Sequence, residues 1–310
     1  MNYINNNHSI LYYTVFMETA ESESKAIEYV FLILHYLTEE DTSECIESIK
    51  KNCNEEKRIV VVDNGSQNDS YKNLSTRYQD DPEIVLLHSD KNLGFAKGNN
   101  IGFKYAKEHF SPKFIIMINN DTCIYQKDFL RIINEKYEKY HFAVLGPDII
   151  TKDGIHQNPW IRNGFSKTGI VAFRMKQRLR ILLTCLGVDD LIFKAIHSND
   201  SRKNKVSGDL TDVPLHGAAL VFSDLYICFF DGLDDRTFLY LEEEILKLYC
   251  DHYKLKTVYS GDLEIYHKED VSTKARTGSN RDKKLFEFKN RIQSSYIYEK
   301  IKKELESTRY

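Results

Sequence analysis

The fold is decided by two stretches of the sequence, RIVVVDNGS at Arg58–Ser66 and FIIMINNDT at Phe114–Thr122. In each, a short apolar run rich in β-branched residues ends at polar residues that include an aspartate, Asp63 or Asp121. Short apolar runs bounded by turn residues are typical of buried strands in a parallel sheet. Ligands of open α/β sheets bind outside the carboxyl ends of the strands. The pattern therefore predicts that both aspartates lie where a ligand binds.

The composition indicates an ordinary globular protein. The chain has 310 residues and a formal net charge of -3, with 42% hydrophobic and 29% charged residues. These proportions are typical of globular domains, and the lack of a net positive charge argues against a nucleic-acid partner. The six cysteines are scattered and form no CxxC pair. This favours reduced cytosolic thiols over a zinc site or a disulfide framework.

The N-terminal sequence predicts a cytoplasmic location. Residues 1–7 carry no Lys or Arg, and the apolar segment Ile10–Met17 runs into acidic residues. The pattern of a secretory signal is therefore missing. No uninterrupted apolar stretch reaches transmembrane length. We expect a cytoplasmic protein, with peripheral contact at the inner face of the plasma membrane left open.

The first half of the chain alternates between predicted strands and predicted helices. The strands are Tyr29–Tyr36, Arg58–Val62, Glu83–Leu87, Phe114–Ile118 and Phe142–Gly146. The helices are 41–51, which Asp41-Thr42-Ser43 can cap, Ser70–Tyr78, Gly94–Glu108 and Lys127–Tyr140. Strands that alternate with helices in this rhythm predict βαβ units and a parallel sheet.

The second half of the chain is less regular. We expect strands within Val213–Ser223 and Thr257–Tyr266, a strand end running into a helix over Thr237–Leu248, and a charged helix over Lys283–Leu305. The chain then divides into a poorly ordered N-terminal extension (1–27), an α/β domain (28–275) with a variable insertion (154–206), and a C-terminal helical tail (276–310). The insertion mixes basic with apolar residues.

Asp63 and Asp121 each admit two interpretations. An aspartate at a strand end can accept hydrogen bonds from a base or a ribose, whereas the Asp-Asn-Gly that begins at Asp63 is also strong turn chemistry. A carboxylate beside a bound diphosphate can hold Mg²⁺ or Mn²⁺, because such ions keep waters and take only one or two protein carboxylates. The alternative for Asp121 is a strand-terminating cap. Its position after a predicted parallel strand favours the ligand role.

An acidic triplet and two histidines are further candidates. One residue of Glu242-Glu243-Glu244 could act as a general base, but acidic residues also favour helix N-termini, and taken alone the triplet favours that structural role. His267 ends a β-rich run and could bind a metal or a phosphate, or be structural; His216 is similarly ambiguous. Neither a GxGxxG fingerprint nor a GxxxxGK[ST] loop occurs, which argues against dehydrogenases and NTPases.

Six segments, taken together and in order, resemble the inverting family 2 glycosyltransferases of the GT-A fold. The similarity is greatest to the rhamnosyltransferase-like bacterial enzymes of capsule and O-antigen synthesis. The segments are VVVDNGS at Val60–Ser66, NLGFAKGNNIG at Asn92–Gly102, INNDT at Ile118–Thr122, HGAALVFS at His216–Ser223, FLYLEEEIL at Phe238–Leu246 and IYHKEDVSTK at Ile265–Lys274. The resemblance implies a GT-A (Rossmann-like) α/β fold: a mostly parallel sheet flanked by helices, with a helical acceptor-side insertion and a C-terminal helix.

The resemblance also implies roles for individual residues. The nucleotide-sugar-binding set would be His35, Tyr36, Asp63, Asn92, Gly94, Asn100 and Asn120, with Asn100 supporting the loop. Asp121 matches the last aspartate of the family's Asp-X-Asp metal motif, in which Asn119 here replaces the first. His267 matches a histidine that binds the metal or the diphosphate in some relatives. Glu243 matches the family's catalytic base, with Glu242 as its rival. The implied cofactor is Mg²⁺ or Mn²⁺.

The implied activity is transfer of a sugar, with inversion, from a nucleotide-sugar donor to a glycan or undecaprenyl-linked glycan acceptor. The insertion would recognise the acceptor, and its basic-apolar mix suits either an anionic membrane surface or a solvated helix that caps the active site. The alternatives are a catalytically silent nucleotide-sugar binding protein and a sugar nucleotidyltransferase. Intact Asp63, Asp121 and Glu243 argue against the first. The second would need a glycine-rich, basic loop near His35–Thr38, which is missing.

Overall fold

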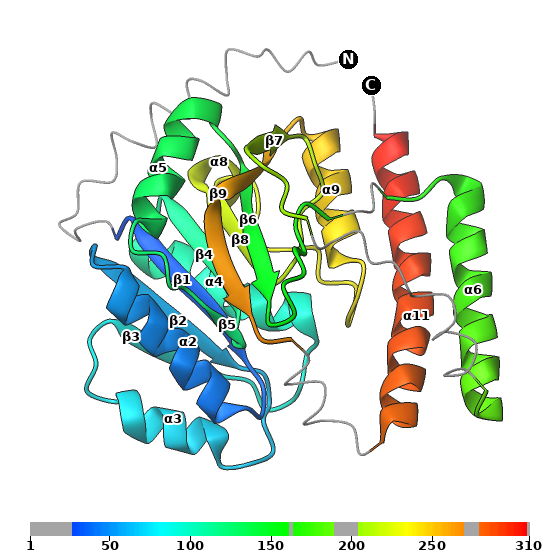
Figure 1. Cartoon of the computed structure of the whole chain (residues 1–310), viewed down its shortest axis with the longest axis horizontal. Coiled ribbons are helices and arrows are strands. Elements are labelled where there is room, and N and C mark those ends of the chain that lie inside the picture. The colour runs from blue at the N-terminus through cyan, green and yellow to red at the C-terminus, as the bar shows by residue number, and fades with distance from the viewer. Residues whose placement is uncertain (1–26, 161–163, 189–203, 270–278, 309–310) are drawn as a thin grey trace.

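The computed structural model describes residues 27–160, 164–188, 204–269 and 279–308 (Figure 1). The strands are β1 (Tyr29–His35), β2 (Lys57–Asp63), β3 (Ile84–His88), β4 (Phe114–Asn119), β5 (Thr122–Cys123), β6 (Val144–Thr151), β7 (Asp209–Thr211), β8 (Ala219–Ser223) and β9 (Thr257–His267). The helices are α2 (Glu39–Asn52), α3 (Ser70–Tyr78), α4 (Phe95–Phe110), α5 (Phe129–Tyr140), α6 (Lys167–Leu186), α8 (Asp224–Ile227), α9 (Glu242–His252) and α11 (Asn280–Ser307). The predicted extension at 1–27 lies outside the described residues, apart from Ile27.

The strands form one sheet in the order β3-β2-β1-β4-β8-β6-β9-β5, with β7 paired to β9. Strands β1 to β4 are parallel, as the alternation of strands and helices predicts. β8 enters the sheet from the opposite end and runs antiparallel to β4 and β6. β5 and β7 are antiparallel to β9, which itself pairs parallel with β6. The α/β sheet flanked by helices is therefore confirmed, and it is mixed overall.

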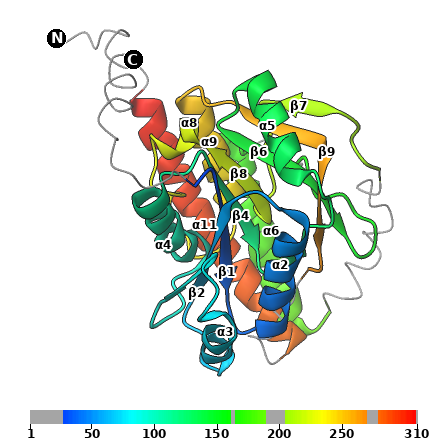
Figure 2. The same cartoon turned by 90° about the vertical axis from the view of Figure 1, so that its left-hand side faces the viewer.

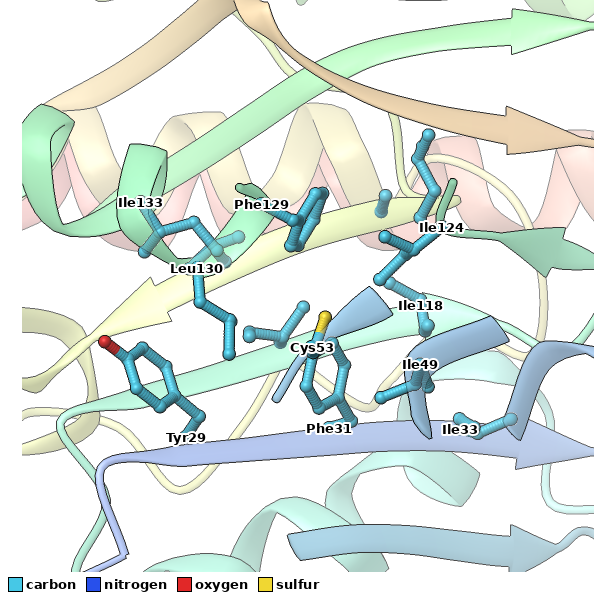
Figure 3. Close-up of a cluster of buried hydrophobic side chains, with 14 of the residues drawn as sticks. Tyr29, Phe31, Ile33, Ile49, Cys53, Ile118, Ile124, Phe129, Leu130 and Ile133 are labelled. Carbon is cyan, nitrogen blue, oxygen red and sulfur yellow. The ribbon is translucent and has the colours of Figure 1, made fainter. Parts of the chain in front are cut away.

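Helices cover both faces of the sheet, because side chains of its central strands alternate between the faces. Tyr29, Phe31 and Ile33 of β1 belong to a buried cluster that includes residues of α2, α3 and α5. Figure 3 shows the α2 and α5 part of it. Val30 and Leu32, between them in sequence, pack toward α4, α8 and α9. Figure 2 shows α2 and α4 on opposite sides of β1. The two buried clusters, one on each face of the sheet, hold the strands in place and so fix the positions of their carboxyl ends.

The helical insertion and the C-terminal helix correspond to α6 and α11, which lie side by side (Figure 1). Ile170 of α6 and Tyr298 and Ile301 of α11 share a third buried cluster with Leu241 and Ile245 at the start of α9. This cluster joins the helix pair to the main body. Within the described residues, no helix has both the length and the apolar character needed to cross a bilayer.

Two local predictions were wrong. The cap at Asp41-Thr42-Ser43 is not formed, because α2 already begins at Glu39, and its acidic first turn complements the helix dipole. The predicted strand end before the acidic triplet is also missing. Tyr240 and Leu241 both adopt φ of 72°, a left-handed conformation that cannot continue a strand, and α9 begins directly at Glu242.

Candidate active site

The carboxyl ends of three parallel strands meet at one edge of the sheet. His35, Asp63 and His88 are the last residues of β1, β2 and β3, and they are register partners. β4 ends on the other side of β1, at Asn119. Asp63 therefore ends its strand as predicted, whereas Asp121 lies two residues beyond the end of β4.

Asp63 is only 1% exposed, and its carboxylate is well supplied with hydrogen bonds. The backbone N–H of Ser66 lies 3.3 Å from each carboxylate oxygen and donates to them. Nδ1 of His88 donates to Oδ2 at 2.8 Å. The turn interpretation of Asp63 thus has direct geometric support, and its contact with a nucleoside stays a prediction.

His88 is a candidate that the sequence reasoning missed. It ends β3 as Asp63 ends β2, and 38% of its side chain is exposed. Its ring stacks on that of Tyr71, with centroids 4.6 Å apart. An aromatic surface of this kind can stack on a nucleobase. A polar residue at the end of a third predicted strand was the available signal.

His35 does not lie where it could touch a ligand directly. Its side chain is fully buried, with Nδ1 2.7 Å from Thr42 Oγ1 and Nε2 2.9 Å from Ser70 Oγ. Burial lowers the pKa of His35 to about 4, so the ring is neutral at neutral pH. His35, which was predicted to bind the donor, instead connects β1 to the first turns of α2 and α3 through these two hydrogen bonds. Tyr36, the next residue, is half-buried.

Asn92 and Gly94 form the frame of the loop that leads into α4. Oδ1 of Asn92 accepts from the backbone N–H of Gly94 at 2.9 Å, and Asn64 holds the same loop from β2. Gly94 has φ of 89°, and a Cβ there would lie 2.3 Å from the carbonyl oxygen of Phe238. Only glycine allows the loop to approach the segment that precedes α9. These two predicted donor-binding residues therefore lie in a loop that contacts the segment just before the acidic triplet.

Asn100 points toward a different part of the molecule. Its amide exchanges two hydrogen bonds of 2.8 Å with the backbone of Leu233. It also lines a cavity of about 550 Å³ with Lys104, Asp234 and Arg236. The structure supports the predicted loop-supporting role of Asn100 and gives no support to contact with the donor.

Asn120 ties the segment after β4 to the start of α2. Its amide nitrogen donates to Thr38 Oγ1 at 2.8 Å and to Thr42 Oγ1 at 3.0 Å. Thr42 also bonds His35, so one hydroxyl links the ends of β1 and β4. Asn120 is 4% exposed, which makes it a positioning residue for Asp121 in this structure.

Asp121 and His267 lie side by side because β5 pairs with the end of β9. Oδ1 of Asp121 is 3.3 Å from Nε2 of His267. Asp121 is 5% exposed, and within the described part of the chain Oδ1 receives no hydrogen bond. A buried carboxylate oxygen without a donor costs free energy, and a bound cation would offset that cost.

The tautomer of His267 explains that missing bond. Oε1 of Gln157 lies 2.7 Å from Nδ1 of His267, and Nε2 of Gln157 donates to Glu269 Oε1 at 2.5 Å. A carboxylate only accepts, so Glu269 fixes which end of the amide faces His267. When the ring is neutral, its proton therefore lies on Nδ1, and Nε2 presents a lone pair to Asp121. Gln157 and Glu269 were not predicted from the sequence.

The acidic triplet separates into three environments. Glu242 is 8% exposed and accepts from Thr237 Oγ1 at 2.9 Å, and burial raises its pKa to about 8. Glu244 is 1% exposed and accepts from the indole N–H of Trp160 at 3.4 Å. Glu243 is the triplet member with a partly exposed side chain. This favours Glu243 over Glu242 as the residue that can reach a substrate.

Glu243 faces the loop that carries His216. Its Oε1 accepts from the backbone N–H of Gly217 at 3.3 Å, and a Cβ at Gly217 would lie 2.9 Å from that oxygen. The backbone N–H of Ala218 donates to Nδ1 of His216, which leaves the proton on Nε2. The ring of His216 lies 6.2 Å from that of His267. The loop thus places the candidate base and the candidate metal ligand on either side of His216.

The residues present fit a divalent cation that is shared with a substrate. Within the described ranges, no three His, Cys, Asp or Glu side chains form a complete metal site. Asp121 and His267 offer two ligand atoms that face each other. Mg²⁺ and Mn²⁺ commonly take one or two protein ligands and complete their shell with phosphate oxygens and water. The oxygen atoms of a bound diphosphate would therefore complete the set of metal ligands.

Relatives were found among curated proteins and among solved structures. A hexosyltransferase of low-salt glycan biosynthesis, Agl10 of Haloferax volcanii, is 27% identical over 127 residues, 41% of this chain and 38% of its own length. Glycosyltransferase GlyG of Streptococcus pneumoniae serotype 4 is 25% identical over 103 residues, a third of each chain (33%). The matches thus span just over a third of the first relative and a third of the second.

The fold is shared with S. aureus TarS. The crystal structure of TarS 1-349 has a TM-score of 0.52 and 14% identity, over 86% of this chain and 72% of that chain. The same protein in complex with UDP-GlcNAc has a TM-score of 0.51 and 13% identity, over 90% of this chain and 71% of that chain. The family model for glycosyl transferase family 2 matches residues 31–195, which is 165 of the 310 residues. With more than half of its length in that match, the chain belongs to glycosyl transferase family 2.

Proposed function

We propose that this chain transfers a sugar from a nucleoside-diphosphate sugar to a hydroxyl of a glycan or undecaprenyl-linked glycan, with inversion at the anomeric carbon. The proposed setting is the cytoplasmic synthesis of a capsule-type or O-antigen-type surface polysaccharide. The names of the relatives support this: one is a hexosyltransferase of glycan biosynthesis, and TarS was crystallised with UDP and with UDP-GlcNAc. The segments that resemble rhamnosyltransferase-like enzymes support the polysaccharide setting.

One observation carries the proposal: two buried potential ligand atoms, Asp121 Oδ1 and His267 Nε2, lie 3.3 Å apart. When the ring of His267 is neutral and its proton lies on Nδ1 toward Gln157, both atoms offer lone pairs to a cation. A cation satisfies both atoms, and the diphosphate of a donor satisfies the cation. When bound, Mg²⁺ or Mn²⁺ supplies positive charge that offsets the charge growing on the leaving diphosphate.

The chain's own residues would then position the donor and remove one proton. His88 and Tyr71 offer a surface for the base, beside the buried Asp63. Glu243 accepts the proton of the acceptor hydroxyl. The acceptor oxygen forms a bond to the anomeric carbon on the face opposite the diphosphate, and the bond to the diphosphate breaks. Holding both substrates in line contributes much of the rate.

The proposal is tested by measuring donor binding and transfer separately. The melting temperature of the wild-type chain is recorded with UDP-, GDP- and dTDP-sugars, each with and without Mn²⁺. We expect one donor class to stabilise the chain, more strongly with Mn²⁺. The product made with that donor should have the opposite anomeric configuration by NMR. Binding without any transfer to glycan or lipid-linked acceptors would identify a silent nucleotide-sugar binding protein.

The candidate base is tested with a matched set of variants. Glu243→Gln keeps the size of the side chain and its bond to Gly217 but cannot accept the proton. Turnover should fall ~100-fold or more while donor binding persists, because general base catalysis contributes ~10²–10⁴-fold. Glu244→Gln, which can still accept from Trp160, is the control and should retain most activity. Full activity of Glu243→Gln would exclude Glu243 as the base.

A further inference from the structure

Helix α6 carries an exposed apolar stripe that the active site does not use. The stripe consists of Val171, Met175, Leu179, Leu182 and Leu186, each 53–65% exposed. They are five of the ten large apolar side chains that are exposed in the described part of the chain. At ~100° per residue the five positions fall within an arc of about 80° on one side of the helix. We call this surface the α6 stripe.

The packing of α6 fixes the stripe toward solvent. On its opposite side, Arg174 is 9% exposed, donates to Ser295 Oγ at 2.9 Å and pairs with Glu299 of α11. Ile170 is buried in the cluster that joins α6, α9 and α11. α11 therefore covers the inner side of α6, and α6 forms the outer edge of the molecule (Figure 1). The helix is also well defined at both ends, with a side-chain cap at Ser166 and Gly187 at φ of 72°.

The surroundings of the stripe are basic. α6 contains five basic residues, Lys167, Arg174, Lys176, Arg178 and Arg180, and no acidic residue. Lys167 and Arg178 border the stripe on one side and Lys176 on the other, and all three are exposed. Tyr296 of α11, 47% exposed, extends this border, because its hydroxyl accepts from Arg178 at 3.0 Å. An apolar centre with cationic and tyrosine edges is typical of helices that lie in a membrane interface.

We propose that the α6 stripe docks this protein on the surface of an anionic phospholipid bilayer, with α6 lying in the plane of the interface. Apolar side chains then leave water for the acyl boundary, and the basic border contacts lipid phosphates. The charge argues against a second copy of this chain as the occupant. Two α6 helices brought face to face would oppose the exposed Lys167, Lys176 and Arg178 of one helix with those of the other, and neither helix carries an acidic residue to pair with them.

Docking at this surface would tether the part of the molecule that carries the candidate base to the bilayer through α6. Ile170 near the start of α6 packs with Leu241 and Ile245, and these two residues flank the acidic triplet. In this one respect the inference rests on the proposed function, because it presents a membrane-linked acceptor to Glu243. The binding itself needs no donor, metal or acceptor, so it can be measured whether or not the chain transfers sugar.

The first test is co-sedimentation of the wild-type chain with sucrose-loaded vesicles, without nucleotide sugar. Vesicles of phosphatidylcholine mixed with phosphatidylglycerol are compared with vesicles of phosphatidylcholine alone. We expect binding to the anionic vesicles at least ~10-fold stronger, and weaker binding as salt is raised, because several basic residues contact the lipid. Absence of binding to the anionic vesicles overturns the proposal.

The second test separates the apolar and the basic contributions. Leu179→Gln/Leu182→Gln should weaken vesicle binding ~10-fold or more, whereas Leu210→Gln/Phe229→Gln, exposed apolar residues away from α6, should not. Lys167→Glu/Lys176→Glu should abolish the preference for phosphatidylglycerol, whereas Lys51→Glu/Lys127→Glu should keep it. All changed side chains are exposed, and unchanged melting temperatures confirm that the variants fold.

Two outcomes of the variant series would overturn the proposal. Equal vesicle binding by the wild type and both α6 variants would place the membrane contact elsewhere. A dimer seen by light scattering, and dissociated by Leu179→Gln/Leu182→Gln, would show that a second copy covers the stripe. Thermal stabilisation by the nucleotide sugar should be the same in the wild type and all four variants. Absence of stabilisation by any nucleotide sugar in the wild type would count against the proposed function and leave the vesicle result unaffected.

Discussion

The ends of β2 and β4 look alike in the sequence but differ in the structure. Each apolar strand is followed by polar residues with an aspartate, and both carboxylates are nearly buried, Asp63 at 1% and Asp121 at 5% exposure. Asp63 receives hydrogen bonds from the Ser66 backbone and from His88. Oδ1 of Asp121 receives none in the described residues and faces a ring nitrogen of His267.

This difference separates a carboxylate whose hydrogen bonds are satisfied within the fold from one with an unsatisfied oxygen, which we propose is a metal ligand. A hydrogen-bonded buried carboxylate stabilises the structure around it, whereas an unsatisfied one costs free energy until something binds. The segment around Asp121 is held by the Thr122 hydroxyl, which donates to the Asn119 carbonyl at 2.7 Å, and by the Asn120 amide, which donates to Thr42 Oγ1 at 3.0 Å. Changing the two aspartates in the same way should therefore give opposite results.

The largest effect is expected from Asp121→Asn. The variant keeps the shape but loses the charge and one of two ligand atoms, so Mn²⁺-dependent transfer should fall at least ~100-fold, since even outer-shell partners of metal ligands are worth ~10–100-fold. The melting temperature without metal should stay the same or rise, because an amide N–H can donate to Nε2 of His267. Kinetics with a Mn²⁺ titration and a thermal melt check both parts. An Asp121→Asn variant that is active but less stable would show that Asp121 stabilises the fold and does not bind the metal.

The next effect concerns the outer partner of His267. Gln157→Leu removes the acceptor that holds the proton on Nδ1, so Mn²⁺ affinity should fall ~10–100-fold. Isothermal titration measures the affinity, and the ¹⁵N shifts of His267 report the change of tautomer. Gln126→Leu is the control, because Gln126 also bridges to the β9 region, through Asp262 and Glu264, but touches neither ligand. Equal affinity in both variants would mean that Gln157 only packs against His267.

A smaller effect, on stability, is expected from Asp63→Asn. The carboxylate loses charge-assisted bonds, so the free energy of unfolding should fall by about 1.5–3 kcal/mol, measured by urea denaturation. Asp148→Asn is a matched control, because Asp148 is also buried and accepts from a histidine, His156, at 2.8 Å. Both variants should be destabilised, but only Asp63→Asn should also weaken donor binding. Unchanged donor binding would restrict Asp63 to its turn.

The sequence predicted the framework of the site better than its contacts. Strand ends at Asp63 and near Asp121 follow from apolar runs and turn residues, and these local signals were sufficient. The partners of those residues come from distant parts of the chain: Gln157 reaches His267 across 110 positions, and Gly217 reaches Glu243 across 26. Such contacts depend on the pairing of β5, β6 and β9, which no local pattern specifies.

Burial was the second quantity that the sequence did not provide. His35 follows an apolar run just as a ligand-binding residue would, yet its position between Thr42 and Ser70 makes it part of the core. Within the acidic triplet, Glu242 and Glu244 lie ~200° apart around α9 and are buried against different partners, Thr237 and Trp160, whereas the Glu243 side chain is partly exposed. The resemblance favoured Glu243, and only the packing of α9 supplies a physical reason for that choice.

Glu242 is a third buried carboxylate, and changing it should affect only how stability depends on pH. Its Oε1 accepts a hydrogen bond from Thr237, and burial raises its pKa from 4.5 to about 8. At a pH between these two pKa values, Glu242 is ionised in the unfolded chain but still carries its proton in the folded chain. The folded state therefore binds more protons, and its stability falls as pH rises through the window, by at most ~1.4 kcal/mol per pH unit.

Glu242→Gln cannot titrate, so its melting temperature should vary less with pH between about 5 and 8. Glu40→Gln, on the exposed side of α2, should keep the wild-type slope. Parallel slopes for the wild type and Glu242→Gln would show that Glu242 is ionised in the folded protein, and it would then regain its place as a rival base to Glu243.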